Sequence, residues 1–82
     1  MDNKTFKIVC FAGLRKYFGS ETTIQLESDS SYSLVIDKLV ESNPEAEEIL
    51  RSSRIAVKEE FVSLNDKISA DTLFLIPPSS GG

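Results

Sequence analysis

The 82-residue sequence contains no histidine, and this absence excludes several kinds of chemistry. Without histidine the chain has no ordinary general base near neutral pH, no Ser/His or Cys/His nucleophile pair and no ordinary zinc site. A single cysteine, Cys10, excludes an internal disulfide and agrees with a reducing compartment. Any chemistry at this chain must therefore use another reactive group.

Positive charge and long apolar runs are also scarce. Nine Lys and Arg stand against 13 Asp and Glu, giving a net charge of −4, and the basic residues are scattered. This pattern excludes the basic stripe that nucleic-acid binding needs and favours a basic protein partner. No apolar run approaches the roughly 20 residues of a membrane helix, and the N-terminus lacks the apolar core of a signal peptide. We expect no membrane contact and a cytoplasmic location.

The residues that are present predict one small domain followed by a tail. A composition of 40% hydrophobic and 27% charged residues is typical of a folded globular protein. The first strand is expected at residues 6–12, FKIVCFA, where alternation puts Phe6, Ile8 and Cys10 on one face and Phe11 on the other. Cys10 could be imagined as a sulfur-carrying thiol, but this parity predicts that it is buried under a helix. We expect a domain at residues 1–76 and an extended diglycine tail at residues 77–82.

Other elements follow from apolar spacing and turn residues. One or two helical turns are expected at residues 14–18, ended by Gly19, and the main helix at residues 32–42, with Ser31 as its cap. The remaining expected elements are strands at residues 22–27, 54–58, 61–64 and 72–76, a short second helix at residues 44–50, turns at Glu59-Glu60 and Asn65-Asp66, and one extra small strand near Ile68. This order predicts an α+β fold, a mixed β-sheet packed on one main helix plus a short second helix, with the first and last strands as parallel central neighbours.

The sequence ends in LIPPSSGG, directly after the last predicted strand. Pro77 and Pro78 have no backbone N–H to continue a strand, so the chain must leave the sheet in an extended form. Residues 77–82 can reach about 20 Å, and Gly81 and Gly82 have no side chain, so the tip can enter a narrow channel. Its reactive group is the terminal carboxylate, which is ionised and unreactive near pH 7 until an ATP-dependent partner converts it to an acyl-adenylate. A sulfur nucleophile would then give a thiocarboxylate, and an amine would give an amide.

Three segments together resemble a known family: KIVCFAGLRKYFG, RIAVKEEFVSL and LIPPSSGG. They are similar to the small subunits of molybdopterin synthase, which are sulfur carriers with a ubiquitin-like β-grasp fold. The resemblance implies that an activating enzyme of the ubiquitin-activating kind uses ATP to adenylate Gly82, which is then converted to a thiocarboxylate. The thiocarboxylate would donate sulfur to cyclic pyranopterin monophosphate, the precursor of the molybdenum cofactor. This sequence departs from the family pattern at Cys10, at Lys58, where Asn is frequent, and at Ser69-Ala70-Asp71.

The resemblance also implies partners and a docking surface. A large synthase subunit would accept the tail within a hetero-oligomer, a heterotetramer, and would supply the catalytic and pterin-binding side chains, so we expect no cofactor or metal on this chain itself. Strand parity places Phe11, Phe74 and Ile76 on the outer face, and Phe61 can join them. With Pro77 and Pro78 of the tail, these residues are the partner-binding candidates.

Other interpretations of the tail remain open at this point. The carrier could supply sulfur for thiamine or another cofactor, or the tail could join the protein to lysines as a ubiquitin-like modifier. The chain could also be a non-catalytic β-grasp interaction module whose terminus is merely frayed. The Pro-Pro that precedes the diglycine favours the molybdopterin pathway.

Overall fold

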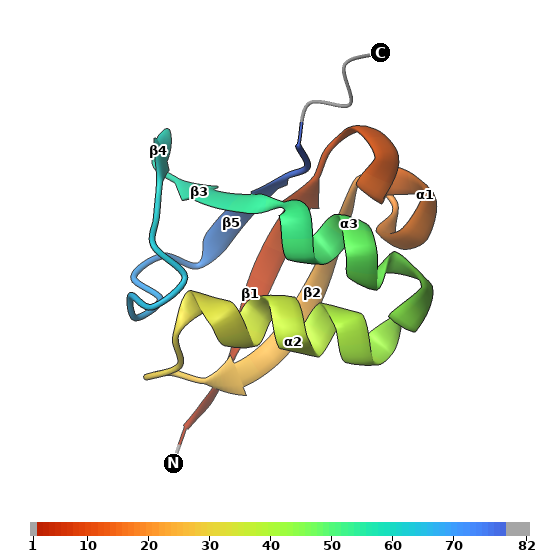
Figure 1. Cartoon of the computed structure of the whole chain (residues 1–82). Helices are drawn as coiled ribbons and strands as arrows, with labels where there is room; N and C mark the ends of the chain where they lie inside the picture. Colours follow the sequence, from red (N-terminus) through yellow and green to blue (C-terminus); the bar gives the residue numbers. More distant parts are fainter. Residues whose placement is uncertain (1, 79–82) are drawn as a thin grey trace.

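The computed structural model describes residues 2–78 and contains helices and one sheet (Figure 1). The strands and helices, in chain order, are β1 (Asn3–Cys10), the 3₁₀ turn η1 (Ala12–Leu14), α1 (Arg15–Phe18), β2 (Glu21–Glu27), α2 (Tyr32–Ser42), the 3₁₀ turn η2 (Pro44–Ala46), α3 (Glu47–Ser52), β3 (Arg54–Val57), β4 (Glu60–Phe61) and β5 (Thr72–Ile76).

The sheet has the order β2-β1-β5-β3-β4. Strands β1 and β5 pair in parallel, with Ile8 opposite Leu73, and the other neighbours are antiparallel. The predicted parallel pairing of the first and last strands at the centre of a mixed sheet is therefore confirmed. Strand β5 is paired on both sides as far as Leu75, and Ile76 then pairs with Arg54 of β3, so the tail starts from a strand that is anchored in the middle of the sheet.

One face of the sheet forms the core with α2 and α3, which lie across it on the same side (Figure 1). The predicted alternation of β1 is confirmed, because Phe6, Ile8 and Cys10 are all at most 1% exposed. The predicted stripe on the main helix is also buried, and it consists of Tyr32, Val35, Ile36 and Leu39. Burying each large apolar side chain contributes about 1.5–3 kcal/mol, so this layer accounts for most of the stability of the fold. The opposite face of the sheet, which we call the open face, has no helix over it in the described residues.

Residues 61–64 were expected to form a strand, but only Phe61 lies in one, and the other three belong to the loop before β5. Only Glu60–Phe61 pairs with β3, and the chain then turns to the start of α2. There the carbonyls of Leu64 and Asp66 accept hydrogen bonds from the amides of Ser33 and Tyr32, at 2.9 and 3.0 Å. These carbonyls satisfy amides that a helix start leaves without intrahelical partners. Ser31 is the N-cap residue of α2, as predicted, but its side chain makes no capping hydrogen bond.

Two strand and helix ends also differ from prediction. Strand β1 begins at Asn3 rather than at Phe6, because its polar first residues pair with the end of β2, Asn3 opposite Glu27. Helix α3 continues to Ser52 rather than ending at residue 50. The hydroxyls of Ser52 and Ser53 donate to the carbonyls of Glu48 and Ile49, at 2.8 and 2.7 Å, and so support this last turn. The extra strand expected near Ile68 is reduced to a single bridge between residues 31 and 67.

Two turns contain residues with a positive φ. Gly19 ends α1, as predicted, and its φ of 77° with ψ at −168° is a conformation that glycine adopts without steric cost. The turn between β3 and β4 lies at Lys58-Glu59 rather than at the predicted Glu59-Glu60. Lys58 and Glu59 have φ values of 51° and 69°, and the two-residue turn joins the paired residues Val57 and Glu60. Such turns favour Asn and Gly, so two ordinary side chains are strained here.

Replacing Lys58 with Asn is expected to stabilise the protein by about 0.5–1 kcal/mol, because Asn tolerates the left-handed conformation better than Lys does. Chemical denaturation should show a higher midpoint with an unchanged slope. Replacing Lys58 with Ala is the matched control, since it removes the same charge without the conformational benefit. An equal gain from both substitutions would contradict strain as the cause.

Candidate functional site

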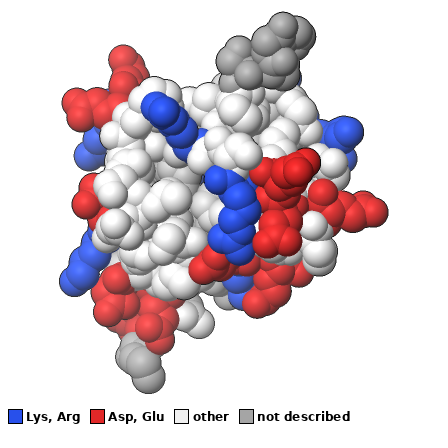
Figure 2. Space-filling view, in the orientation of Figure 1, with Lys and Arg blue, Asp and Glu red and all other residues white. Residues whose placement is uncertain are grey.

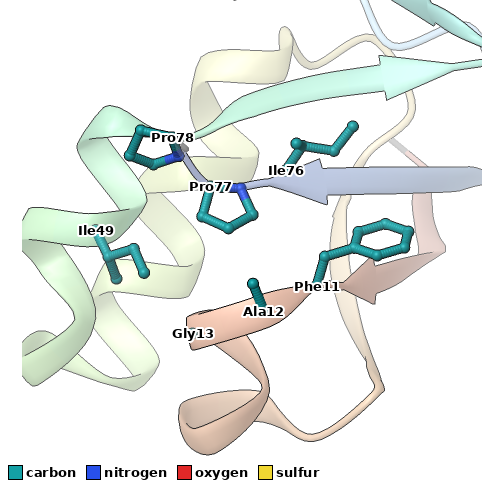
Figure 3. A pocket seen from close by; sticks show the side chains of 7 residues that line it. All are labelled: Phe11, Ala12, Gly13, Ile49, Ile76, Pro77 and Pro78. Atoms are coloured by element: carbon teal, nitrogen blue, oxygen red, sulfur yellow. The ribbon is translucent and has the colours of Figure 1, made fainter. Parts of the chain in front are cut away.

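The tail leaves the domain from the end of the central strand β5. Ile76 is the last residue of β5, and Pro77 and Pro78 follow it beyond the end of this strand (Figure 3). Neither proline has a backbone N–H, so the hydrogen-bond ladder cannot continue past Ile76. The predicted end of the last strand is thus confirmed. The predicted catalytic residues, Gly81 and Gly82, lie outside the described residues.

We call Ile76, Pro77 and Pro78 the tail root. An apolar pocket of about 560 Å³ lies on one side of it. Its lining comes from the end of β1, from η1, from α3 and from the tail root: Phe11, Ala12, Gly13, Ile49, Ile76, Pro77 and Pro78 (Figure 3). Gly13 allows η1 to approach α3 closely, because a Cβ there would lie 3.2 Å from Cδ1 of Ile49. Among residues 2–78, no charged residue lines this pocket, so it offers contact to an apolar group.

Three residues of this pocket, Ala12, Gly13 and Ile49, were not among the predicted site residues, and Ile49 is the largest of them. It belongs to α3, whose buried residue is its neighbour Leu50, and it is only partly buried against the core. A partly exposed apolar residue beside the buried stripe was the available signal, but such residues are common on helices. Only the packing of α3 against η1 makes Ile49 part of the site.

A second pocket, of about 630 Å³, lies on the other side of the tail root. It is lined by Ser52, Arg54, Phe61, Ile76, Pro77 and Pro78. Ile76, Pro77 and Pro78 therefore line both pockets and separate them. The guanidinium carbon of Arg54 lies 5.3 Å from the centre of the Phe61 ring, within the range of a cation–π contact.

The predicted partner-binding aromatic residues meet on the open face. The Phe11 and Phe74 ring centres are 6.2 Å apart, and Phe61 is 58% exposed. Ala56 of β3 lies between Phe74 and Phe61, because it pairs with Phe74 of β5 on one side and with Phe61 of β4 on the other. We call Phe11, Phe61, Phe74 and Ile76 the open-face patch. Together with Pro77 and Pro78, it forms a continuous surface around the tail root.

Cys10 is excluded from this surface by burial, as predicted. Its side chain is fully buried, and the removal of water raises the pKa of the thiol, an effect that the charge of Arg15 only partly offsets. Arg15 itself donates a hydrogen bond from Nε to the carbonyl of Cys10, at 3.2 Å. A buried, protonated thiol is a poor nucleophile.

In contrast to the open-face patch, the helix side of the molecule carries many charged side chains (Figure 2). Acidic side chains gather where α2 ends and α3 begins, beside basic side chains (Figure 2). Here Arg51 is paired with Asp37 at 2.9 Å and with Glu47 at 3.4 Å. Within residues 2–78, no group of three or more His, Cys, Asp or Glu side chains could hold a metal ion. No helix in the same range is long and apolar enough to cross a membrane.

Comparisons with solved structures agree with the observed topology. Small archaeal modifier protein 1 (SAMP1) of Haloferax volcanii superposes with a TM-score of 0.79 at 24% identity, over 96% of this chain and 100% of that one. A second crystal structure of that protein gives 0.76 at 22% identity, over 92% and 98%. A putative molybdopterin converting factor subunit 1 of Pyrococcus furiosus gives 0.77 at 21% identity, over 92% and 98%. These structures confirm the ubiquitin-like β-grasp fold.

Sequence comparisons identify the family. A search of curated proteins finds no significant match. A family model, described as the ThiS family, matches residues 8–82, which include the end of β1, the open-face patch and the diglycine end. The chain therefore belongs to the ThiS family of ubiquitin-like sulfur carriers.

Proposed function

We propose that the protein carries sulfur for molybdopterin synthesis and acts as the small subunit of a molybdopterin synthase. The main supporting observation is the tail root, where Pro77 and Pro78 follow a doubly paired central strand beside the open-face patch. A rigid body with an apolar docking surface next to its C-terminal residues is suited to deliver those residues into a partner.

The chemistry proceeds at the carboxylate of Gly82. An adenylating enzyme joins the carboxylate to AMP from ATP and releases pyrophosphate. Hydrosulfide then attacks the acyl carbon, so that a C–S bond forms, the bond to AMP breaks and the terminus becomes a thiocarboxylate. If the donor is a persulfide, the product is an acyl disulfide, which a thiol must reduce to release the thiocarboxylate. In the complex with the large subunit, this thiocarboxylate donates its sulfur to cyclic pyranopterin monophosphate. Two such transfers give the dithiolene that holds molybdenum.

This chain contributes binding and positioning, while the large subunit supplies the catalytic side chains. The open-face patch lies against the large subunit, and Pro77 and Pro78 prevent the sheet from continuing past Ile76. A docking area of about 800 Å² per partner, common for specific complexes, is consistent with a patch that spans β1, β5 and β4. The synthase would be a heterotetramer with two copies of each subunit. The name of the Pyrococcus structure, a converting factor subunit 1, agrees with this assignment.

The test combines a pull-down with an intact-mass measurement. We expect the purified chain, incubated with its adenylating enzyme, ATP and a sulfur source, to gain the mass of one sulfur in place of one oxygen. Cys10→Ala is the control, because a variant without the buried thiol should gain the same mass. An unchanged mass in the presence of a competent enzyme would refute the proposal.

The competing destinations of the activated terminus differ in their products. A carrier for thiamine or another cofactor would form the thiocarboxylate but no stable complex with a large synthase subunit. A protein modifier, as the name of the Haloferax structure describes that protein, would give isopeptide conjugates with lysines in cell extracts. An inert interaction module would give neither product.

A further inference from the structure

Arg54 has an unusual position in the docking surface. It begins β3, where it pairs with Ile76 of β5, and its guanidinium lies 5.3 Å from the ring centre of Phe61. Both Ile76 and Phe61 also line the second pocket with it. Arg54 is therefore a cation set between two apolar members of the open-face patch, next to the tail root.

Two other basic groups, one on this sheet face and one on α3, have acidic partners. Lys7, on the open face, lies 3.2 Å from Glu21, and Arg51, on the helix side, bonds to Asp37 and Glu47. By contrast, no Asp or Glu in residues 2–78 lies within ion-pair distance of Arg54. Glu60 is near in sequence, but strand alternation points it to the side opposite Phe61.

Docking changes the environment of this charge. A partner that covers Ile76 and Phe61 also covers Arg54, which lies between them. An ionised group that loses its water without gaining a partner opposes binding strongly. The covered guanidinium therefore needs an acceptor, and the described part of this chain does not provide a carboxylate for it.

We propose that Arg54 determines partner specificity by binding a carboxylate that the docking partner presents into the second pocket. This inference rests on the proposed function, since the partner is the large synthase subunit. An Asp or Glu side chain fits the site best, because the planar guanidinium presents parallel N–H donors that match two carboxylate oxygens. Stacking on Phe61 limits the orientations of the guanidinium, which reduces the entropy lost when the pair forms.

The carboxylate also has a role in partner choice. The chain has a net charge of −4, so an attractive partner is basic overall. One acidic group within a basic surface, facing Arg54 in the second pocket, fixes how the two surfaces align. A protein that presented an apolar or a basic group at this point would leave Arg54 buried without a counter-charge or would repel it.

The experiment measures the dissociation constant of the complex between the full chain and the large synthase subunit. Arg54→Met keeps the length of the side chain without its charge, and we expect binding to weaken by about 30-fold or more. Arg54→Glu should weaken binding further, because two carboxylates would then face each other. Arg54→Lys should lie between the parent and Arg54→Met, since it keeps the charge but loses the planar fork.

The controls separate this inference from the proposed function. Arg51→Met removes an arginine from the helix side and should leave the dissociation constant within about twofold of the parent. Melting curves of all variants confirm that they fold. An acidic-to-arginine substitution in the large subunit that restores binding to Arg54→Glu would identify the carboxylate.

Two results would overturn the inference in different ways. If Arg54→Met binds as tightly as the parent while Phe61→Lys does not bind, the docking surface stands and the carboxylate contact is wrong. If the parent chain itself does not bind a large synthase subunit, the proposed function is wrong and the inference falls with it.

Discussion

A chain that lacks Gly82 is expected to melt like the parent and to lose thiocarboxylate formation. The last core residue is Leu75 and the sheet ends at Ile76, so the described packing does not involve the terminal residue. A change so far from the core should shift the melting temperature by no more than about 4 °C. Shortening an extended chain by one residue withdraws its carboxylate by about 3.3 Å.

That withdrawal is large compared with the tolerance of a reaction. A misplacement of about 1 Å can lower a rate by about 10²-fold, so we expect at least this loss in the rate of thiocarboxylate formation. Intact mass measured over time, with the adenylating enzyme, ATP and a sulfur source, gives the rate. Ser79→Gly is the matched control because it keeps both the length of the tail and its diglycine end. Undiminished sulfur transfer by the truncated chain would favour an inert tail.

Replacing Phe61 with Lys is expected to weaken docking to the large subunit by about 100-fold or more with little loss of stability. Phe61 is 58% exposed, so the folded protein gains little from it, whereas a buried aromatic anchor at an interface often contributes more than 2 kcal/mol to binding. The new ammonium group would also lie next to Arg54. Titration of the complex gives the dissociation constant, and chemical denaturation gives the free energy of unfolding.

Two other variants make this comparison specific. Leu34→Lys is the control, because Leu34 is 42% exposed on α2, across the molecule from the open face, and should not affect docking. Phe11→Lys should weaken docking too, but it should also cost about 0.5–1.5 kcal/mol of stability because Phe11 packs on Phe74. Equal effects of Phe61→Lys and Leu34→Lys on docking would mean that the open-face patch is not the interface.

The parts of the fold that local sequence rules determine were predicted well. Helix α2 has the expected bounds because its apolar stripe repeats with the helical period, and β5 has them because Pro77 ends it. The burial of Cys10 followed from strand parity alone. Two features that depend on contacts with distant parts of the chain were not predicted. The start of β1 depends on pairing with β2, and the first amides of α2 depend on carbonyls in the loop before β5.

The candidate site shows the same division. Alternation along β1 and β5 was enough to place Phe11, Phe74 and Ile76 on one face. Phe61 joins them because Ala56 is small enough to lie between the rings of neighbouring strands. Ile49 and Arg54 could not be assigned to the site from sequence, because each reaches the tail root only through the packing of α3 or the pairing of β3 with β5.

The parallel pairing of β1 with β5 also determines how the molecule resists force. Strand β1 begins at Asn3 at one end of the sheet, and β5 ends at Ile76 at the other end. A motor that pulled on the C-terminal segment against the N-terminal one would load the hydrogen bonds between these strands in shear, all at once, instead of opening them one by one. The protein should therefore be mechanically strong along the axis that joins the start of β1 to the end of β5, and its unfolding under load should be slow.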